Sequence, residues 1–397
     1  MYSRIIFMVT ILLIASATQI SSDIYIPSLM TISDQLQGAT FNLAQISVSI
    51  FLFGVSITQL LAGPLSEGIG RKQPIMTGLV IMSIGSVICA TSGTISLLII
   101  GRFIQGLGAG ALASLWRTVF RDVMSGEELA KYSSFISIFM ILVVAIAPAL
   151  GGYFETIGWR SSFIFMLGYT LILLIIVLIN YKETGRHHHL ERLKPHFIIK
   201  TYKSLLTSPI FMGITTCIFL SYGGLFSWIV LAPSLLMQKV GLTPIMFGWT
   251  ISIAAFLSFS TAAWTNVHFI KHLGIPSMMR IGWIIMTGAG VLMLAGYYLF
   301  GITTWSIILP ILLFYFGSAL IWPNAFSAAF TPFGKIAGYT GSLYGFMQLL
   351  GGAIMGSLSA LLPETDQRIL AIVIITTSIT SLLIYQFWVL PKSEASN

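Results

Sequence analysis

Two ionisable side chains stand inside stretches that are otherwise apolar. Asp23 is the only one besides Tyr25 between Ile5 and Met30. A charged side chain at the centre of a bilayer costs roughly 2.5–3.5 kcal/mol on insertion scales, and such residues commonly mark ion or proton pathways. The other reading is an Asp in the headgroup layer that caps a helix. The pattern favours the first reading, with Asp23 as a proton carrier.

Arg102 is the second of these residues, within LIIGRFIQGLGAGA (98–111). Gly106, Gly108 and Gly110 allow close helix contact, so the guanidinium can reach a carboxylate or a backbone group of a neighbouring helix. Asp23 is the only acidic residue well inside any other expected span and is therefore the expected partner. The alternative is an Arg102 side chain that extends along its apolar stem to a membrane surface.

A third candidate is the connection GPLSEGIGRK, residues 63–72. Glycines at positions 63, 68 and 70 allow the chain to turn tightly. The Glu67 carboxylate can pair with Arg71 or Lys72, or with the basic end of another helix. A charged junction of this kind can hold one state of a bundle that rocks between two. The latch predicted here consists of Gly63, Glu67, Gly70, Arg71 and Lys72.

The stretch AIAPALGGY, residues 145–153, adds a bend to this set. Pro148 removes a backbone hydrogen bond from its helix, while Gly151 and Gly152 permit tight packing. Such residues are common in membrane helices, so this segment by itself says little about function.

Side chains that could contact a small molecule are aromatic or carry an amide. Most aromatic residues of membrane helices pack against neighbours or form an interfacial belt. The candidates for a substrate pocket are Tyr25, Tyr222, Trp322, Asn324, Tyr344 and Gln348. We expect no cofactor and no metal, because neither His187–His189 nor the pair His268 and His272 has a second group of ligands nearby.

The composition sets the class of protein that must position these residues. Hydrophobic residues make up 56% of the 397-residue chain and Asp, Glu, Lys and Arg only 8%, where a soluble domain carries about 25% charged residues. Apolar blocks of about 20 residues each fit membrane-spanning helices. The expected spans are 5–27, 43–63, 75–93, 95–116, 132–154, 161–180, 210–231, 244–265, 277–299, 304–328, 338–361 and 368–390.

Basic residues predict the orientation of these spans. With the N-terminus in the cytoplasm, all 20 Lys and Arg residues fall inside except Arg102, within a span, and Arg160, Lys239 and Arg368, outside. This distribution follows the positive-inside rule and places both termini in the cytoplasm. The net charge of +8 then describes contact with anionic lipid rather than nucleic-acid binding.

The chain divides into two halves of six expected spans. The longest polar stretch, 181–209, separates an N-terminal half (1–180) from a C-terminal half (210–397). GIGRKQPIMTG (68–78) and HLGIPSMMRIG (272–282) form a weak internal repeat. Paired halves are typical of secondary transporters, with the substrate site near the midplane between them. The fold class expected is an all-α membrane protein of twelve transmembrane helices in two pseudo-symmetric halves.

These motifs together resemble the major facilitator superfamily, and specifically its twelve-span drug:proton antiporters. Glu67 stands where an Asp is usual in the loop signature, and Ala147 replaces the usual Gly of the antiporter signature. Further segments are similar to the bicyclomycin-resistance (Bcr/CflA) subfamily: DIYIPSL (23–29), WRTVFRDVMSGEELAKY (116–132), GWRSSFIF (158–165) and WPNAFSAAFTPFGKIAGYTGSLYGFMQLLGGAIMG (322–356).

The resemblance implies proton-coupled efflux of drugs or other small molecules by alternating access, from the bacterial inner membrane. The coupling ion would be the proton, and the absence of a soluble domain favours a monomer. A proton-coupled exporter or importer of one metabolite or siderophore shares these motifs and stays open. A polytopic membrane enzyme is a remote alternative, because no cluster of acids, histidines or nucleophiles lies near one membrane face.

Overall fold

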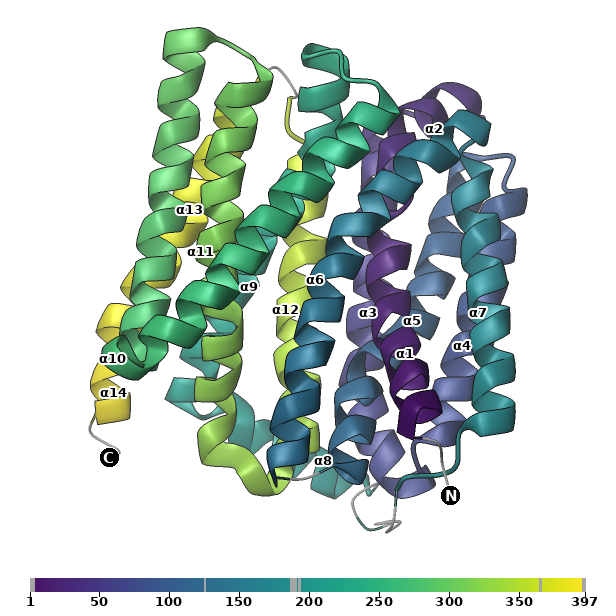
Figure 1. Ribbon diagram of the computed structural model, residues 1–397, viewed down its shortest axis with the longest axis vertical. Coiled ribbons are helices and arrows are strands. Elements are labelled where there is room, and N and C mark those ends of the chain that lie inside the picture. Colours follow the sequence, from purple (N-terminus) through teal and green to yellow (C-terminus); the bar gives the residue numbers. More distant parts are fainter. Residues whose placement is uncertain (1–3, 125, 186–190, 192–193, 364–365, 395–397) are drawn as a thin grey trace.

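The computed structural model describes every residue of the chain except 1–3, 125, 186–190, 192–193, 364–365 and 395–397. The described chain is built from helices (Figure 1). Those before the central connection are α1 (Arg4–Asp23), α2 (Leu29–Gln35), α3 (Phe41–Ile69), α4 (Lys72–Thr91), α5 (Ile95–Val123), α6 (Gly126–Ile157) and α7 (Arg160–Asn180). Those after it are α8 (Pro195–Leu206), α9 (Pro209–Pro233), α10 (Pro244–Phe300), α11 (Thr304–Phe330), α12 (Ala337–Ala360), α13 (Arg368–Ile384) and α14 (Leu390–Glu394).

Eleven helical segments of the described residues are long and apolar enough to cross a membrane. The longest, α10, has 57 residues and leaves helical geometry at Gly274 (φ 73°). Counted as two arms, it brings the total to the twelve crossings expected from the sequence. The expected loop at 266–276 is wrong, because the helix continues to Leu273 and only Gly274, with no Cβ to clash, makes the turn.

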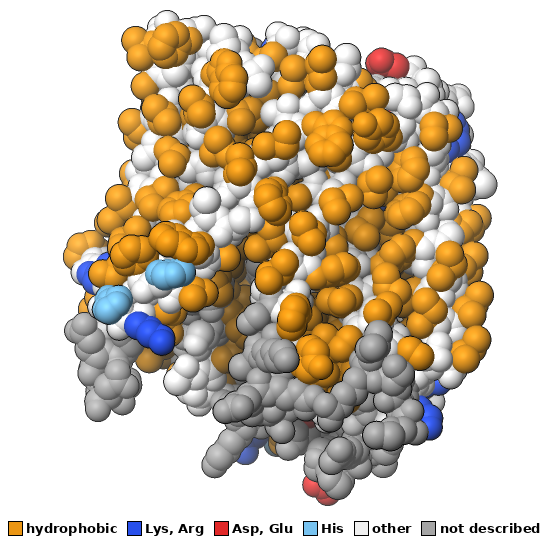
Figure 2. Space-filling model, in the orientation of Figure 1, with side chains coloured by type: hydrophobic (Ala, Val, Ile, Leu, Met, Phe, Trp, Pro, Cys, Tyr) orange, Lys and Arg blue, Asp and Glu red, His pale blue; other side chains and the backbone are white. Residues whose placement is uncertain are grey.

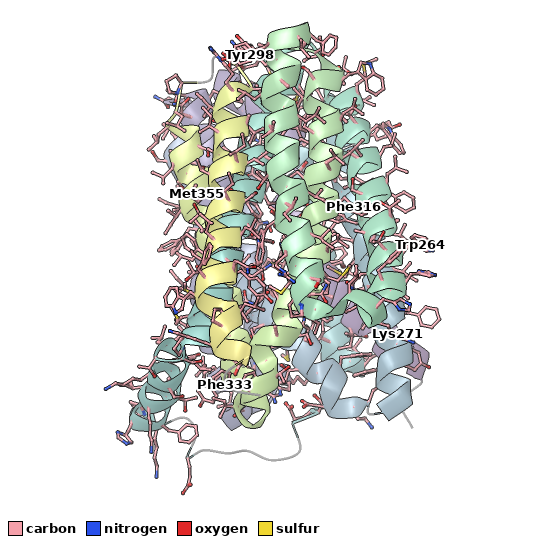
Figure 3. The ribbon with its side chains drawn as sticks, turned by 90° about the vertical axis from the view of Figure 1, so that its left-hand side faces the viewer. Trp264, Lys271, Tyr298, Phe316, Phe333 and Met355 are labelled. Atoms are coloured by element: carbon pink, nitrogen blue, oxygen red, sulfur yellow. The ribbon has the colours of Figure 1, made fainter. Side chains whose placement is uncertain are left out.

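Both chain ends lie at the same end of the bundle, here called the terminal face (Figure 1). Hydrophobic side chains are spread over the side of the molecule that Figure 2 shows, with few charged side chains among them. A surface of this kind suits contact with the hydrocarbon of a membrane. Soluble proteins rarely expose such large apolar areas to water. The labelled Tyr298 and Phe333 mark the two opposite ends of the bundle in Figure 3.

The helices pack in two groups that follow the chain. Contacts of α1, α4 and α7 are mainly with other helices before residue 181, and those of α11 and α13 mainly with helices after residue 208. Two contacts join the groups extensively: α3 with α12, and α6 with α10. Most packing is therefore within each group, and the two groups meet mainly along these two helix pairs.

The weak sequence repeat has the same geometry in both halves. Gly70 and Gly274 both have a positive φ, 88° and 73°, where a residue with a side chain would be strained. Eight residues after each of these glycines, a second glycine packs against a neighbouring helix. A Cβ at Gly78 would lie 2.7 Å from the carbonyl oxygen of Gly108, and a Cβ at Gly282 would lie 2.7 Å from the carbonyl oxygen of Gly317. The two halves therefore use equivalent glycines for the same turn and the same helix crossing.

Gly106 tests the role of close helix contact within the first half. A Cβ at this position would lie 2.2 Å from the backbone oxygen of Phe51, so α5 could not stay in its place against α3. We expect Gly106→Ala to lower the stability of the purified protein by about 1–3 kcal/mol, the usual cost of overpacking, in thermal unfolding followed by tryptophan fluorescence. Gly168→Ala in α7 is the control, because nothing lies within 4 Å of its Cβ. Equal losses of stability from the two substitutions would contradict the role of Gly106 in the close contact between α5 and α3.

Candidate functional site

The first span is interrupted at the acidic residue. Helix α1 ends at Asp23, two residues form a turn, and a single 3₁₀ turn (Ile26–Ser28) leads into α2. Pro27 in this turn has no backbone N–H to continue a helix. A Cβ at Gly151 of α6 would lie only 1.9 Å from the carbonyl oxygen of Ile24. The break is therefore packed tightly against α6, and the glycine at 151 makes that approach possible.

The carboxylate of Asp23 is buried but only half satisfied. Its side chain is 5% exposed. Gln19 Nε2 donates a hydrogen bond to Oδ2 over 2.6 Å, while Oδ1 has no partner among the described residues. A buried, unpaired carboxylate oxygen is costly. Protonation of the carboxyl, or a ligand that donates to it, would remove this cost.

Arg102 lies fully buried beside the same break. Its Nη1 donates to the carbonyl oxygen of Ser21 at 3.0 Å and to the side chain of Gln105. The guanidinium carbon stands 4.2 Å from the centre of the Tyr25 ring and 4.1 Å from that of Phe51. Two aromatic faces and a free carbonyl at a helix end thus compensate part of its buried charge.

The expected direct pair between Arg102 and Asp23 is wrong for this structure. No hydrogen bond or ion pair joins these two described residues; the arginine donates to the backbone of Ser21 instead. The reason is the helix break, which leaves carbonyl groups of the last turn without intrahelical partners. Arg102 satisfies one of these carbonyls. Its Nε and Nη2 atoms have no hydrogen-bond partner among the described residues.

Asp23 faces a cavity between the two groups of helices, called here the central cavity, with an empty volume of about 560 Å³. Gln19 and Asp23 from the first group and Tyr222 and Trp322 from the second line it. The sequence did not single out three further aromatic residues of the lining, because nothing in their local pattern distinguishes them from packing residues: Phe226, Phe259 and Tyr315. Asp23 is the only carboxylate among the lining residues described.

The other four pocket candidates do not line the central cavity. Tyr25 is fully buried against Arg102, and its hydroxyl bonds Ser47 Oγ at 3.1 Å. Asn324 donates to Asn266 Oδ1 and to the carbonyl of Leu320. Tyr344 packs with Phe326, 5.5 Å between ring centres. Gln348 is partly exposed on α12, away from the lining.

The connection between α3 and α4 differs from the expected loop. Gly63 and Gly68 lie inside α3, which runs to Ile69, so only Gly70 turns the chain. Arg71 Nε pairs with Asp122 of α5 at 3.0 Å rather than with Glu67. Gly63 and Gly68 can lie inside a helix because a glycine there allows a neighbouring helix to approach closely, and it need not turn the chain.

Gly63 and Glu67 instead face the second group of helices. A Cβ at Gly63 would collide with Ser342 Oγ, 2.0 Å away, and would lie 3.0 Å from the carbonyl oxygen of Gly338. The Glu67 carboxylate lies against Gly338, in the first turn of α12. A negative charge at a helix N-terminus is favourable. This part of the connection joins the halves at the terminal face.

A second junction of the halves lies toward the opposite face. A Cβ at Gly152 of α6 would lie 2.5 Å from the carbonyl oxygen of Pro244, and one at Gly248 of α10 would lie 2.4 Å from that of Pro148. Pro148 itself lies inside α6, which continues to Ile157. Figure 1 shows α6 and α10 near each other toward the end opposite the terminal face and diverging toward the terminal face. The helices of this pair can therefore approach closely only over one part of their length.

The histidines give no metal site among the described residues. The ring of His268 packs on Trp264, and its Nδ1 lies 2.8 Å from that residue's carbonyl oxygen. No group of three or more His, Cys, Asp or Glu side chains in the described part of the chain could hold a metal ion. His187–His189 lie outside the described residues.

The architecture defines a class: a polytopic helical membrane protein whose two helix groups enclose a cavity with one buried carboxylate. The family model of the Major Facilitator Superfamily matches residues 11–360. The chain therefore belongs to this superfamily, whose members are membrane transporters rather than enzymes.

Three curated relatives are similar over almost the whole chain. The MFS-type transporter YdgK of Bacillus subtilis is 29% identical and covers 91% of this chain and 90% of its own length. Multidrug resistance protein D of Escherichia coli is 26% identical, with 95% and 93% covered. A bicyclomycin resistance protein homolog of Haemophilus influenzae is 24% identical, with 90% and 89% covered.

Solved structures share the fold at low sequence identity. A D-xylose–proton symporter superposes with a TM-score of 0.76 at 16% identity, over 96% of this chain and 97% of that one. A peptide transporter of the POT type reaches 0.77 at 13% identity, over 98% and 94%. These two structures confirm the fold expected from the sequence.

The Glu183 carboxylate, just after α7, fixes the turn between α3 and α4. It accepts backbone hydrogen bonds from Arg71 at 2.8 Å and Lys72 at 3.0 Å. Partial burial opposes its ionisation, but these bonds and that from the Gly185 N–H outweigh burial and lower the pKa of Glu183. A lowered folded-state pKa stabilises the fold above the ordinary value of 4.5 and loses this contribution as the pH falls through the lowered one.

We therefore expect Glu183→Gln to lower the melting temperature of the purified protein at neutral pH. The difference from the parent protein should shrink as the pH falls below 4.5. Differential scanning fluorimetry between pH 3 and pH 8 measures it, and Glu191→Gln in the same connection is the control. A destabilisation by Glu183→Gln that does not change with pH would argue against the charge as its cause.

Proposed function

We propose that the protein is a proton-coupled secondary transporter that exports small molecules in exchange for protons. Support comes from the family, from the cavity between the two helix groups, and from the curated relatives whose names state multidrug or bicyclomycin resistance. With the segments of the sequence described above, these relatives support membership of the Bcr/CflA group of drug:proton antiporters.

One observation carries the proposal: Asp23 is the only carboxylate among the described residues that line the central cavity, and one of its oxygens is unpaired. A proton neutralises this carboxylate and reduces the cost of burying it. A substrate that donates a hydrogen bond or carries a positive charge does the same. Proton and substrate therefore compete for one group, which is the requirement for their exchange.

Arg102 has a supporting role in this proposal. It lies beside the same helix break as Asp23 and donates a hydrogen bond to the carbonyl oxygen of Ser21, two residues away. A fixed positive charge near the carboxyl favours release of the proton. Movement of α1 against α5 would change the distance between the Arg102 guanidinium and the Asp23 carboxyl. The affinity of Asp23 for protons would therefore depend on the state of the transporter.

The two junctions between the halves fit alternating access. At the terminal face, Gly63 and Glu67 of α3 meet the start of α12; near the opposite face, Gly152 and Gly248 bring α6 and α10 together. Opening one junction while the other stays closed would expose the cavity to one side at a time. In this proposal Gly70, Arg71 and Lys72 hold the turn that positions the terminal-face junction.

The proposed setting is the inner membrane of a bacterium, with the terminal face toward the cytoplasm. The distribution of Lys and Arg supports this orientation. The chain would work as a monomer surrounded by lipid, with the proton as coupling ion and no cofactor.

Asp23→Asn tests the proposal. The amide keeps the size and hydrogen-bonding groups of the side chain but cannot bind and release a proton, so proton-driven transport should fall by at least about tenfold, as for loss of an essential acid–base group. The assay is uptake of ethidium by inverted membrane vesicles energised with a pH gradient, with and without an uncoupler. Asp34→Asn is the matched control, because Asp34 is exposed on α2.

Undiminished gradient-driven uptake by Asp23→Asn would contradict the proposed coupling residue. Substrate movement in the same direction as the protons would contradict export by antiport and favour the importer alternative.

A further inference from the structure

A second cavity lies between the two helix groups, nearer the terminal face, and is called here the vestibule. The space between its walls, open solvent included, is about 430 Å³. Side chains of α3 and α5 line it from the first group, and residues of α11 and α12 from the second. Phe326 and Phe330 come from the last turns of α11 and Gly338 from the first turn of α12. This is the end of the bundle that Phe333 marks in Figure 3.

Arg117 of α5 provides the positive charge of the vestibule. Its side chain is exposed within this cavity. No carboxylate among the described residues pairs with it, and no described polar atom accepts a hydrogen bond from it. Its guanidinium carbon lies 4.3 Å from the centre of the Trp116 ring and 5.8 Å from that of Phe326. Arginine is suited to bidentate recognition of carboxylates, and here its donors are free.

Two buried polar atoms of the same cavity also have no partner among the described residues. Gln59 is 7% exposed and Ser342 is 1% exposed; among the described residues, Gln59 Oε1 accepts no hydrogen bond and Ser342 Oγ makes none. Both residues line the vestibule together with Arg117. Buried polar groups of native proteins are normally satisfied by protein, water or ligand. The three side chains together offer a charged donor, an amide and a hydroxyl to one small molecule.

Aromatic rings complete the lining. Phe326 and Phe330 stack with 4.0 Å between their centres, and both rings contact Tyr344, at 5.5 Å and 6.2 Å. Arg117 therefore stands beside a group of rings that can pack against an aromatic ligand. Gly338 and Gly341 contribute only backbone to the lining on the α12 side.

We propose that the vestibule is a second substrate subsite that binds small aromatic carboxylates, whether acidic or zwitterionic, through Arg117. The carboxylate would pair with the guanidinium, its ring would pack on Phe326 and Phe330, and an N–H or O–H group of the ligand would bond Gln59. The proposal rests on the transport function given above and adds the substrate class. An unpaired arginine repels simple cations. The vestibule should therefore bind a molecule with a free carboxylate more tightly than the ester of the same molecule.

The vestibule and the central cavity lie along one route between the halves. Trp322, which lines the central cavity, and Phe326, which lines the vestibule, lie one turn apart on α11. Along α5, Arg117 lies about 22 Å from Arg102 toward the terminal face, at 1.5 Å per residue. A ligand that arrives from the terminal face therefore meets Arg117 before it reaches Asp23.

Equilibrium binding to the purified protein tests the subsite without any proton gradient. The probes are rhodamine 110, which carries a free carboxylate, and its methyl ester rhodamine 123, which is a simple cation with the same ring system. We expect the parent protein to bind rhodamine 110, and Arg117→Gln to lose at least about tenfold in affinity for it, as for one charge-assisted contact. Affinity for rhodamine 123 should stay equal or rise, because the repulsion is removed.

Arg117→Lys should keep part of the preference for the carboxylate dye, since the charge remains but the bidentate geometry is lost. Arg280→Gln is the control, a half-exposed basic residue of α10 that does not line the vestibule. Equal loss of both dyes in a folded Arg117→Gln protein would overturn the proposal and indicate a structural contact of Arg117 with Phe326. No binding of rhodamine 110 by the parent protein would overturn it as well.

The proposed transport function fails by a different result. Dye binding that depends on Arg117 would support the subsite even if vesicles showed no exchange for protons. Proton-driven transport that is indifferent to Arg117 would leave the transporter in place and remove the subsite.

Discussion

The structure depends on the burial of two opposite charges that do not pair directly. Asp23 and Arg102 share the region of the α1 break, where the guanidinium satisfies a backbone carbonyl and the carboxylate keeps one oxygen free toward the central cavity. A direct ion pair would neutralise both groups and leave nothing for a proton or a ligand to compensate. The break, and the glycine of α6 that packs on it, keep the carboxylate available.

Contacts between the halves obey a related constraint. Inside a membrane, apolar surface gives little driving force between helices, so helices associate through close packing and polar contacts. The close contacts of α3 with α12 and of α6 with α10 run through Gly63, Gly152 and Gly248. At Gly152 and Gly248 the nearest atoms across the junction are backbone carbonyl oxygens, whereas at Gly63 the nearest atom is the side-chain oxygen of Ser342. The cavities lie between these junctions, with Asp23 in one and Arg117 in the other.

Much of the fold could be predicted from the pattern of apolar blocks, because a membrane-spanning helix must be apolar along its whole length. The number of crossings and the buried positions of Asp23 and Arg102 were predictable in this way, and the repeat that relates Gly70 to Gly274 was predictable from the spacing of its glycines. The continuous helix through Gly63 and Gly68 was not, since the sequence gives no sign of whether a glycine turns the chain or admits a neighbouring backbone. Glu183, which holds the α3–α4 turn, comes from the distant connection after α7.

By itself, the sequence determined the class of protein and the two costly charges, since each of these follows from composition or from a residue type at a place where hydrocarbon penalises it. The superfamily came from the resemblance of its motifs. The tertiary structure decided which partners those charges have. Arg102 meets Ser21 because a helix break exposes a carbonyl there, and Arg71 meets Asp122 because α5 ends beside the turn. The tertiary structure also decided which aromatic residues face a cavity. In the sequence, a ring that packs against a neighbouring helix looks the same as a ring that lines a cavity, and only the position of the other half distinguishes them.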